Sequence, residues 1–440
     1  MSSVPQIRAI LQRVLGPRAD ELARETGFVQ RRRVLAGADF VQAVVFAALQ
    51  HGQPTSEEIS EMLGRRSVEI SESGLSQRFT ERAAHVLLRL IHELVHEPLQ
   101  ADQPAPVELL QRFEAVEVED STTIRLPPAL AHVWKGCGGG SGQSKAGIKL
   151  HVRWDLKQGG LQGPVLTDAK CADQASPLRQ RGIAKGVLNI TDEGYCSLEW
   201  LKQQKGFFLT RPRSTVVFLS ATSRQELELE QIGPQVSNGT WQANVLVGRE
   251  ARLPARLILV RVPEEVIEQR RERIRTDAKR RGKQPNPQAL LRAQWTILIT
   301  NVAQEKLSLS EVLVLQRARW QIELLFKRWK QGDQIDEWLP GRRSKWRTLC
   351  ELYAKIIAVL IEQWFLVAAT WHDPYRSLAK AAKRVHQAAG ELLSALVGET
   401  NWQRVTTRLI RAMQACRVHR RGKHPCHAQL LLDGLDWSLT

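Results

Sequence analysis

Hydrophobic positions recur with helical spacing through the first hundred residues. In residues 39–50 (DFVQAVVFAALQ) and 81–96 (ERAAHVLLRLIHELVH) they fall three or four positions apart, which is the period of a helix with one buried face. Thr55 or Ser56 can cap a further helix between these two. Residues 1–110 are therefore predicted to form a helical domain.

Within this domain, residues 56–81 are compatible with a helix, a turn and a second helix that carries Ser76, Gln77 and Arg78. In a helix-turn-helix unit, the second helix enters the major groove of DNA, where Arg78 would contact the nucleic acid. The alternative is that both helices belong to an ordinary helical bundle. The hydrophobic pattern alone supports the bundle at least as well as the DNA-binding unit.

From residue 116 the pattern changes to short β-prone runs: AVEVED, IKLHVRWDL and GPVLTDA, then a helical stretch, VLNITD, a short helix and FFLTRP. Three strands followed by alternating helix and strand predict a mixed α/β sheet. Residues 214–294 contain three more β-prone runs and a charged helix near 264–283, which together predict a second β-rich unit. Residues 295–301 (WTILITN) read as one more strand, and the chain beyond 308 is predicted to be mostly helical.

The charge of the chain points to a polyanionic partner. Among 440 residues, 63 Lys and Arg against 46 Asp and Glu leave a net charge of +17, which favours nucleic acid. The most apolar stretch, residues 356–371, contains Glu362 and Gln363 and is shorter than the roughly 20 residues that span a membrane. The N-terminus shows no signal-peptide pattern, and the six cysteines form no CxxC pair. We therefore expect a cytoplasmic protein with reduced thiols and no membrane association.

Residues 308–332 (SLSEVLVLQRARWQIELLFKRWKQG) carry the most informative pattern. Ser308 and Glu311 form a capping-box pair at the start, and Gly332 stands where a helix would end. One face of the predicted helix is apolar. The other presents charged residues three or four positions apart: Arg319, Glu323, Lys327 and Lys330. Taken alone, this face is typical of ordinary ion pairs along an exposed helix.

Two aspartates elsewhere suggest more than ion pairs. Asp120 ends the run AVEVED, and Asp192 follows VLNIT, so each is expected at the carboxyl end of a strand. An open α/β sheet presents its functional site at this edge. Together with Glu323, the two aspartates offer three oxygen ligands, which suit Mg²⁺ or Mn²⁺ better than zinc. Two such cations about 4 Å apart can activate a nucleophile and stabilise the leaving oxygen of a phosphodiester.

These residues resemble those of a known enzyme family. The segment around Glu323 is similar to the signature helix of bacterial insertion-sequence transposases of the DDE type, in the branch named for a Tyr-x2-Arg-x3-Glu-x6-Lys motif. Arg319, Glu323 and Lys330 fit that spacing, whereas Gln316 occupies the tyrosine position.

Two further motifs extend the resemblance over residues 30–370. Asp120 in Glu-Asp-Ser-Thr and Asp192 in Asp-Glu-Gly-Tyr match the two aspartate motifs of the family in order. Residues 73–82 (SGLSQRFTER) resemble its N-terminal region. Three ordered motifs are far more specific than any one of them.

The resemblance implies an α/β fold with an RNase H-like core, a mixed sheet with flanking helices, interrupted by a β-rich insertion. The expected segments are a helical DNA-binding domain at 1–110, the first part of the core at 111–213, the insertion at 214–294, the second part of the core at 295–350, and a helical C-terminal region with a basic tail at 351–440.

It also implies a chemistry. A DDE transposase cleaves DNA at terminal inverted repeats and joins the 3′-hydroxyl ends to target DNA, most often as a homodimer on the DNA. Asp120, Asp192 and Glu323 would hold two Mg²⁺ or Mn²⁺ ions, and the protein would work in the bacterial cytoplasm, associated with the nucleoid. The expected DNA contacts are Arg319, Lys330, Lys327, Trp295, Trp320, Arg211 and Arg78.

Trp295 and Gln316 leave one part of this chemistry open. Trp295 stands where relatives that form a DNA hairpin carry a tryptophan that stacks on a flipped base, and such stacking offsets part of the cost of unpairing. A role for Trp295 in core packing fits the sequence equally well. Gln316 in place of tyrosine weakens one phosphate contact that the resemblance implies, and it makes the hairpin intermediate less certain.

Two rival functions remain compatible with the sequence. The first is a DNA-binding protein of the same descent that has lost catalysis, and the second is an RNase H-like nuclease of DNA repair. The three carboxylates argue against the first rival, although Gln316 keeps it open. A preference for transposon ends would separate a transposase from the second.

Two competing metal signals are weaker. Residues 92–96 (HELVH) match the HExxH pattern of zinc proteases, but Pro98 follows at once and no third ligand can be placed, so we interpret the match as chance. The tail at 416–427 (CRVHRRGKHPCH) offers cysteine and histidine ligands whose spacing fits no common zinc finger. A basic, partly disordered tail is the preferred interpretation.

Overall fold

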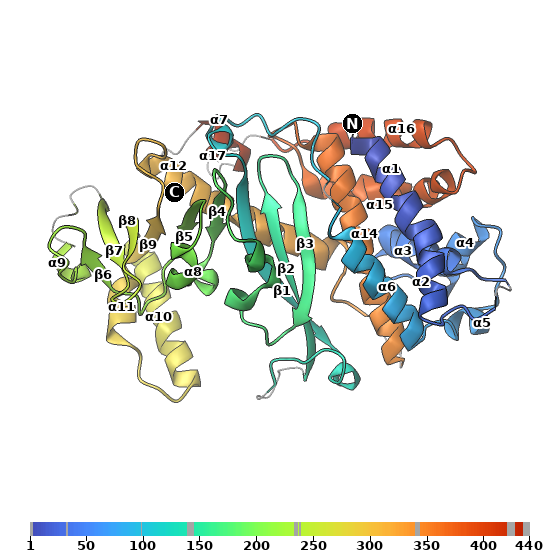
Figure 1. The fold of residues 1–440 in the computed structure, drawn as a ribbon, viewed down its shortest axis with the longest axis horizontal. Coiled ribbons are helices and arrows are strands. Elements are labelled where there is room, and N and C mark those ends of the chain that lie inside the picture. Colours follow the sequence, from blue (N-terminus) through green and yellow to red (C-terminus); the bar gives the residue numbers. More distant parts are fainter. Residues whose placement is uncertain are drawn as a thin grey trace.

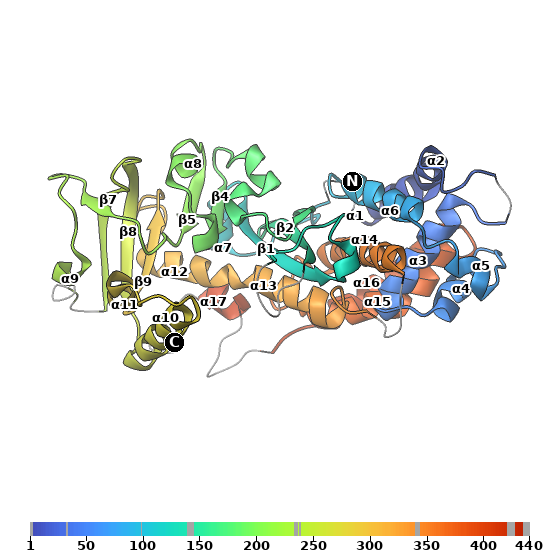
Figure 2. The ribbon, with the colours of Figure 1, turned by 90° about the horizontal axis from the view of Figure 1, so that it is seen from below.

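The computed structural model describes residues 3–31, 34–97, 99–138, 145–232, 236, 239–338, 344–419 and 427–433. Figure 1 shows an elongated molecule, with a body of helices at one end and a sheet that crosses the centre and continues to the other end. Figure 2 shows the same division from below.

The elements follow the order predicted from the hydrophobic pattern. The first half of the chain contains α1 (Ser3–Arg13), α2 (Ala19–Glu25), α3 (Gly37–His51), α4 (Ser56–Gly64), α5 (Glu72–Ser76), α6 (Glu81–Leu94), α7 (Glu108–Gln111), β1 (Val116–Leu126), β2 (Ala146–Asp155), β3 (Leu161–Asp168), β4 (Leu188–Thr191), α8 (Leu198–Lys202), β5 (Phe207–Thr210) and β6 (Phe218–Ser220). The second half contains α9 (Leu229–Ile232), β7 (Thr240–Val247), β8 (Leu253–Arg261), α10 (Glu264–Arg280), α11 (Pro287–Arg292), β9 (Trp295–Thr300), α12 (Leu309–Ala318), α13 (Trp320–Lys327), α14 (Lys345–Thr370), α15 (Leu378–Leu396), α16 (Trp402–Gln414) and α17 (His427–Asp433).

One mixed sheet holds the strands together, in the order β3-β2-β1-β4-β5-β9-β8-β7-β6. β1, β2 and β3 are antiparallel, whereas β4 runs parallel to both β1 and β5. The β-rich segment at 214–294 was expected as a separate unit. Its strands instead continue the same sheet, because β9 pairs with β5 on one side and with β8 on the other.

β1 is longer than predicted. The sequence places Asp120 at the end of a strand, but β1 continues to Leu126, so that expectation is wrong. The β-branched residues 122–124 favour an extended chain, and β1 pairs with β2 as far as Leu126 opposite Ala146. β4 accompanies only the first three residues of β1, so Asp120 still lies beyond the point where the parallel pairing ends.

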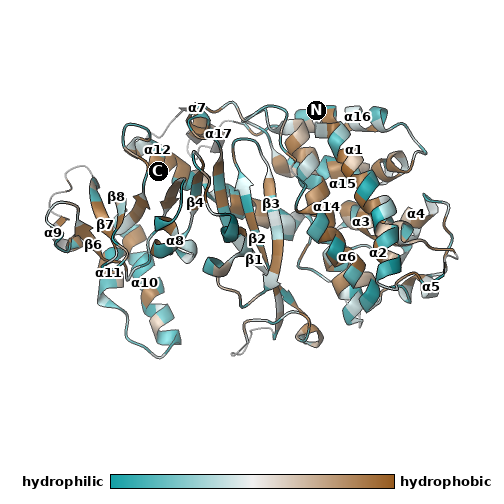
Figure 3. Cartoon of the chain, in the orientation of Figure 1, coloured by the Kyte–Doolittle hydropathy of each residue, from teal (hydrophilic) through white to brown (hydrophobic). Residues whose placement is uncertain are grey.

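The helices of the two chain ends form one body. α14 is almost completely buried and packs against α3 and α6 from the N-terminal part and against α15 and α16 from the C-terminal part. By length and composition alone α14 is apolar enough to cross a membrane, but 94% of its most apolar window is buried inside the protein. It is therefore the central core helix of this body. Figure 3 shows the contrast with α10, which is largely hydrophilic.

The predicted helix-turn-helix unit is not present in the expected form. α4 ends at Gly64 as predicted, but α5 spans only five residues and ends at Ser76. Gln77 and Arg78 lie in the turn that follows, because Phe79 is buried and Thr80 already caps α6. The short α5 favours the bundle alternative over a recognition helix that carries Arg78.

The signature segment forms two consecutive helices. Ser308 caps α12 through the predicted box with Glu311, and the break between α12 and α13 falls at Arg319. Residues 328–332 end the segment as one π-helical turn. The predicted apolar stripe is buried throughout and consists of Val312, Leu315, Ile322, Leu325, Phe326 and Trp329.

Candidate active site

Strand pairing brings the two aspartates together. Val118 on β1 pairs with Ile190 on the parallel strand β4, and each aspartate follows two residues after its paired residue, close enough for the charge of Asp192 to act on Asp120. Asp192 is the first residue after β4 and precedes a short 3₁₀ turn. α13 packs against β1 and brings Glu323 to the same edge of the sheet. Three segments that are distant in sequence therefore meet at one place.

Arg319 bridges two of the carboxylates. Its Nη1 lies 3.5 Å from Asp120 Oδ2, and its Nη2 donates to Glu323 Oε1 at 2.8 Å. The Arg319 side chain is only 9% exposed. The Arg319–Glu323 pair is one of the predicted ion pairs along the helix. Arg319 also contacts Asp120 of β1, and this contact links the helix to the sheet. The guanidinium thus offsets repulsion among the carboxylates.

The site holds more negative charge than Arg319 neutralises. Burial raises the pKa of Asp120 to about 6, and the charges of Glu323 and Asp192 act in the same direction. The Ser121 N–H, which donates to Asp120 Oδ1 at 2.8 Å, and Arg319 oppose this rise in pKa. A carboxyl group with a raised pKa in a partly buried acidic cluster is a recurrent feature of functional sites.

The oxygen atoms at this site are suitable ligands for a hard divalent cation. Asp192 Oδ1 is buried and has no hydrogen-bond partner within the described part of the chain. A buried carboxylate oxygen without a partner is costly, and a bound cation would satisfy it. Asp120, Asp192 and Glu323 supply only oxygen atoms, which are the ligands that Mg²⁺ and Mn²⁺ prefer.

Several expected DNA contacts lie beside the carboxylates. Lys330 Nζ donates to the Thr123 carbonyl of β1 at 3.1 Å, Lys327 is exposed, and Trp320 is 51% exposed. Arg211 directly follows β5, and the pairing of Thr191 with Thr210 brings it level with Asp192 on the adjacent strand. Three cationic side chains and one exposed aromatic ring thus belong to the segments that carry the acidic site.

Trp295 and Arg78 lie elsewhere. Trp295 is 2% exposed and belongs to the hydrophobic core between β5–β9 and α8, so its ring has no free face for a base. The structure therefore favours core packing over base stacking for Trp295. Arg78 lies in the helical body, on the wall of a pocket between α2 and α6.

The contacts of Asp173 and the environment of Tyr195, both near the site, were not expected from the sequence. On the opposite face of β1, Ser121 Oγ donates to Asp173 Oδ1 at 2.8 Å, and Lys149 Nζ lies 3.1 Å from the same oxygen. Burial and the nearby carboxylates raise the pKa of the Tyr195 phenol, which therefore stays protonated. Gln316, at the tyrosine position of the resemblance, has a buried Oε1 without a partner among the described residues.

A second cluster of titratable groups lies outside the predicted site. Among the described residues, Asp333, Glu362 and His386 form a group that could hold a metal ion, since their ligand atoms lie within 4.8 Å of one another. Of the HELVH segment, only residues 92–94 belong to α6, which ends at Leu94. Residues 420–426 of the cysteine- and histidine-rich tail lie outside the described residues.

This cluster is balanced in charge without a metal. His386 Nε2 lies 2.9 Å from Asp333 Oδ1 and 2.7 Å from Glu362 Oε2, and Arg328 Nε lies 2.8 Å from Glu362 Oε1. Although burial lowers it, hydrogen bonds to the two carboxylates raise the pKa of His386 to about 9. Two cations and two carboxylates thus join the end of the signature segment to α14 and α15. The signal for this cluster was Glu362 inside an apolar helix, since a buried charge needs a partner.

The cluster predicts a loss of stability at alkaline pH. His386 has a folded pKa near 9, above its unfolded value of about 6.5, so its contribution is fully present below pH 6.5 and is lost as pH rises through 9. Burial and Glu362 raise the pKa of Asp333 to about 7, so ionisation of Asp333 also lowers stability as pH rises, but most of that loss is complete near pH 7. Urea unfolding at pH 7 and pH 9 should show a fall of about 2 kcal/mol in the wild type.

His386→Gln is the control for this prediction, because glutamine fills similar space and does not titrate. The variant should be less stable than the wild type at pH 7 and should lose little more by pH 9. An equal fall in both proteins would assign the pH dependence to other groups.

The chain is similar over most of its length to proteins of one family. Residues 115–361 match the family model described as a transposase DDE domain. The transposase for insertion sequence element IS231F of Bacillus thuringiensis subsp. israelensis is 25% identical, over 96% of this chain and 93% of the relative. That for IS231C of B. thuringiensis subsp. berliner is 28% identical, over 78% of this chain and 75% of the relative. That for IS1151 of Clostridium perfringens is 21% identical, over 78% and 76%.

Proposed function

Because the chain belongs to the DDE transposase family and is a DNA transposase, we propose that Asp120, Asp192 and Glu323 are its catalytic carboxylates. The observation that supports this assignment most is the convergence of the three. The charge of Asp192, directly after the parallel strand β4, acts on Asp120 of β1, and Arg319 links Asp120 to Glu323. All three lie inside the matched family segment.

The proposed site would hold two Mg²⁺ or Mn²⁺ ions between these carboxylates. When bound, such ions activate the attacking oxygen and stabilise the leaving oxygen of the phosphodiester. The unpartnered Oδ1 of Asp192 and the raised pKa of Asp120 both mark a place where added positive charge is favourable. Arg319 supplies part of that charge from the protein itself.

We further propose how the protein engages DNA. Lys327 and Lys330, on the helical segment that carries Glu323, would hold backbone phosphates near the cleaved bond, with Arg211 and Trp320 beside them. The substrate would be duplex DNA that ends in terminal inverted repeats. Its freed 3′-hydroxyl ends would be joined to target DNA by a homodimer in the cytoplasm.

We also propose how the fold is divided. The half of the sheet from β3 to β5, with α13 packed on β1, would be an RNase H-like core, and residues 214–294 an insertion that lengthens its sheet. Arg319, Glu323 and Lys330 support the Tyr-Arg-Glu-Lys branch of the family. Gln316, which cannot replace the tyrosine hydroxyl, leaves the hairpin intermediate the least supported part of this proposal.

Nicking of duplex DNA tests the proposed function directly. Purified protein should cut at the end of the inverted repeat that borders its own gene in the presence of Mg²⁺ or Mn²⁺, and it should leave the DNA intact in the presence of a chelator. Binding without nicking would identify a transposase-derived DNA-binding protein. Nicking with no preference for the repeat would identify a nuclease.

Lys330→Ala should weaken DNA binding more than it weakens chemistry. One phosphate contact would be lost, so the slope of log affinity against log salt should become shallower by about one unit. Binding titrations between low and physiological salt measure this slope. An unchanged slope would remove Lys330 from the DNA interface and leave it its contacts with the Thr123 carbonyl and with Asp336.

A further inference from the structure

A fourth carboxylate contacts the segments that carry Asp120 and Asp192. Asp173 begins a 3₁₀ turn, Asp173–Ala175, that follows β3. Its Oδ1 accepts from Ser121 Oγ at 2.8 Å, on the face of β1 opposite to Asp120. Lys149 Nζ of β2 lies 3.1 Å from the same oxygen. Asp173 is therefore fixed against β1 and β2 from behind the acidic site.

The second oxygen of Asp173 faces the turn that follows Asp192. A Cβ atom at Gly194 would lie 3.0 Å from Asp173 Oδ2, which is tighter than ordinary van der Waals contact. Gly194 belongs to the 3₁₀ turn Glu193–Tyr195, directly after Asp192. Gln174, the neighbour of Asp173, donates from Nε2 to the Cys196 carbonyl at 2.6 Å. The two turns are thus packed closely against each other.

Ser121 connects Asp173 to the Asp120 carboxylate. Its N–H donates to Asp120 Oδ1 at 2.8 Å, while its Oγ donates to Asp173. Burial raises the pKa of the Tyr195 phenol, and the charges of Glu119, Asp120 and Asp173 act in the same direction, so Asp120 and Asp173 both lie near this ring. The orientation of the Asp120 carboxylate is therefore linked to the position of Asp173.

Strand pairing alone does not fix the distance between Asp120 and Asp192. The neighbouring strands β1 and β4 (Figure 1) pair only as far as Val118 and Ile190, and both aspartates lie beyond that point. Carboxylates that share a site repel one another, so side-chain contacts must hold them in place. Asp173 lies where such contacts are needed, since it reaches the segments of both aspartates.

We propose that Asp173 is a positioning residue that, together with Ser121 and Lys149, holds Asp120 and Asp192 at the spacing that binds divalent cations. Asp173 would touch neither the cations nor the DNA. Lys149 offsets its charge, so that a fourth carboxylate can lie behind the site without adding to the repulsion. The inference rests on the proposed function, since it takes the three carboxylates as the metal site.

Calorimetric titration of the purified full chain with Mn²⁺ tests this role without any activity measurement. Asp173→Ala should weaken Mn²⁺ binding about tenfold or more, which is the usual effect of removing a residue that orients a metal ligand. Asp173→Asn should retain most of the affinity, because its amide oxygen still accepts from Ser121. Ser121→Ala removes the same hydrogen bond from the other side and should also weaken Mn²⁺ binding.

Asp373→Ala is the matched control in the helical body. Asp373 also joins an ion pair, with Arg417 at 2.7 Å, and also accepts a hydrogen bond, from the Tyr375 N–H. This variant should bind Mn²⁺ like the wild type. Thermal melting establishes that each variant is folded, and DNA affinity without metal should be unchanged in Asp173→Ala. Wild-type Mn²⁺ affinity in Asp173→Ala would reduce the Asp173–Lys149 contact to an ordinary ion pair and overturn the proposal.

Gly194→Ala tests the contact with the turn after Asp192. The backbone of Gly194 does not require glycine, but the added methyl group must displace the Asp173 carboxylate. It should therefore weaken Mn²⁺ binding in the wild type and cost little more in Asp173→Ala, where the crowded oxygen is gone. Additive losses in the double variant would contradict a role through Asp173.

The same titration separates this inference from the proposed function. If the wild type binds no Mn²⁺, or if Glu323→Gln binds it as well as the wild type does, the site of three carboxylates fails and the role of Asp173 fails with it. If Glu323→Gln loses Mn²⁺ binding while Asp173→Ala keeps it, the proposed function stands and only the role of Asp173 is wrong.

Discussion

Glu323→Gln is expected to reduce cleavage of a terminal-repeat duplex by about a thousandfold or more, because a catalytic cation supplies several kcal/mol of transition-state stabilisation. Glutamine keeps the size and helix propensity of glutamate but is a neutral and much poorer metal ligand. DNA affinity in the absence of metal should hold or rise, since one negative charge near the phosphates is gone. Single-turnover nicking and binding titrations on the same protein measure both effects.

Lys330→Ala is the matched comparison on the same helical segment. It should bind DNA more weakly than Glu323→Gln does, and its cleavage rate should fall less. If Arg319 and Glu323 formed only an ion pair along a helix, Glu323→Gln would cost a few tenths of a kcal/mol of stability and leave cleavage alone. Nicking by Glu323→Gln at near the wild-type rate would therefore refute the assignment of Glu323 as a metal ligand.

Glu362→Ala is expected to destabilise the fold by about 3–5 kcal/mol, because it leaves charged partners buried without compensation. Glu362 has no exposed surface and contacts both Arg328 and His386. Glu391→Ala is the control, since Glu391 forms an exposed pair with Arg408 on the surface, and its loss should cost no more than about 1 kcal/mol. Chemical denaturation at pH 7 compares the two variants.

Metal removal distinguishes a charge-balanced cluster from a structural metal site at Asp333, Glu362 and His386. A charge-balanced cluster predicts that a chelator leaves the stability of the wild type unchanged. A fall in stability on chelation comparable to that in Glu362→Ala would show instead that Asp333, Glu362 and His386 hold a structural metal.

Local sequence patterns predicted the elements that carry the site, whereas they could not predict the contacts between segments that are distant in the sequence. The capping box at Ser308 and the apolar stripe through Ile322 and Trp329 depend on residues a few positions apart, so spacing alone identifies the helical segment. The end of β1 was misjudged at Asp120 because strand length depends on pairing with β2, which no local pattern encodes.

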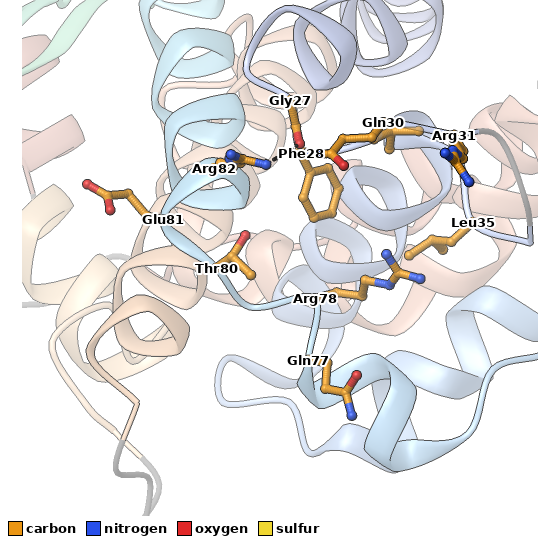
Figure 4. Close-up of a pocket in the computed structure, with 11 residues that line it drawn as sticks. Gly27, Phe28, Gln30, Arg31, Leu35, Gln77, Arg78, Thr80, Glu81 and Arg82 are labelled. Atoms are coloured by element: carbon orange, nitrogen blue, oxygen red, sulfur yellow. Dashed lines mark hydrogen bonds between the residues drawn. The ribbon is translucent and has the colours of Figure 1, made fainter.

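The roles of single side chains depend on such distant pairing. Arg319 was expected to hold a phosphate, but it bridges Asp120 and Glu323, and only the packing of α13 on β1 makes that reach possible. The sequence could not decide between base stacking and core packing for Trp295, because the pattern of a strand does not indicate which face of the sheet other elements cover. Arg78 was assigned to a helix, but α5 ends at Ser76 and Thr80 caps α6, so Arg78 lies in the turn between them (Figure 4).

The central claim is that Asp120, Asp192 and Glu323 form one divalent-cation site. Anomalous diffraction from crystals soaked in Mn²⁺ tests it most directly, because manganese is located independently of any activity. We predict anomalous peaks in contact with all three carboxylates in the wild type and their loss or weakening in Glu323→Gln. Peaks confined to Asp333, Glu362 and His386, or none at the three carboxylates at saturating Mn²⁺, would contradict the claim.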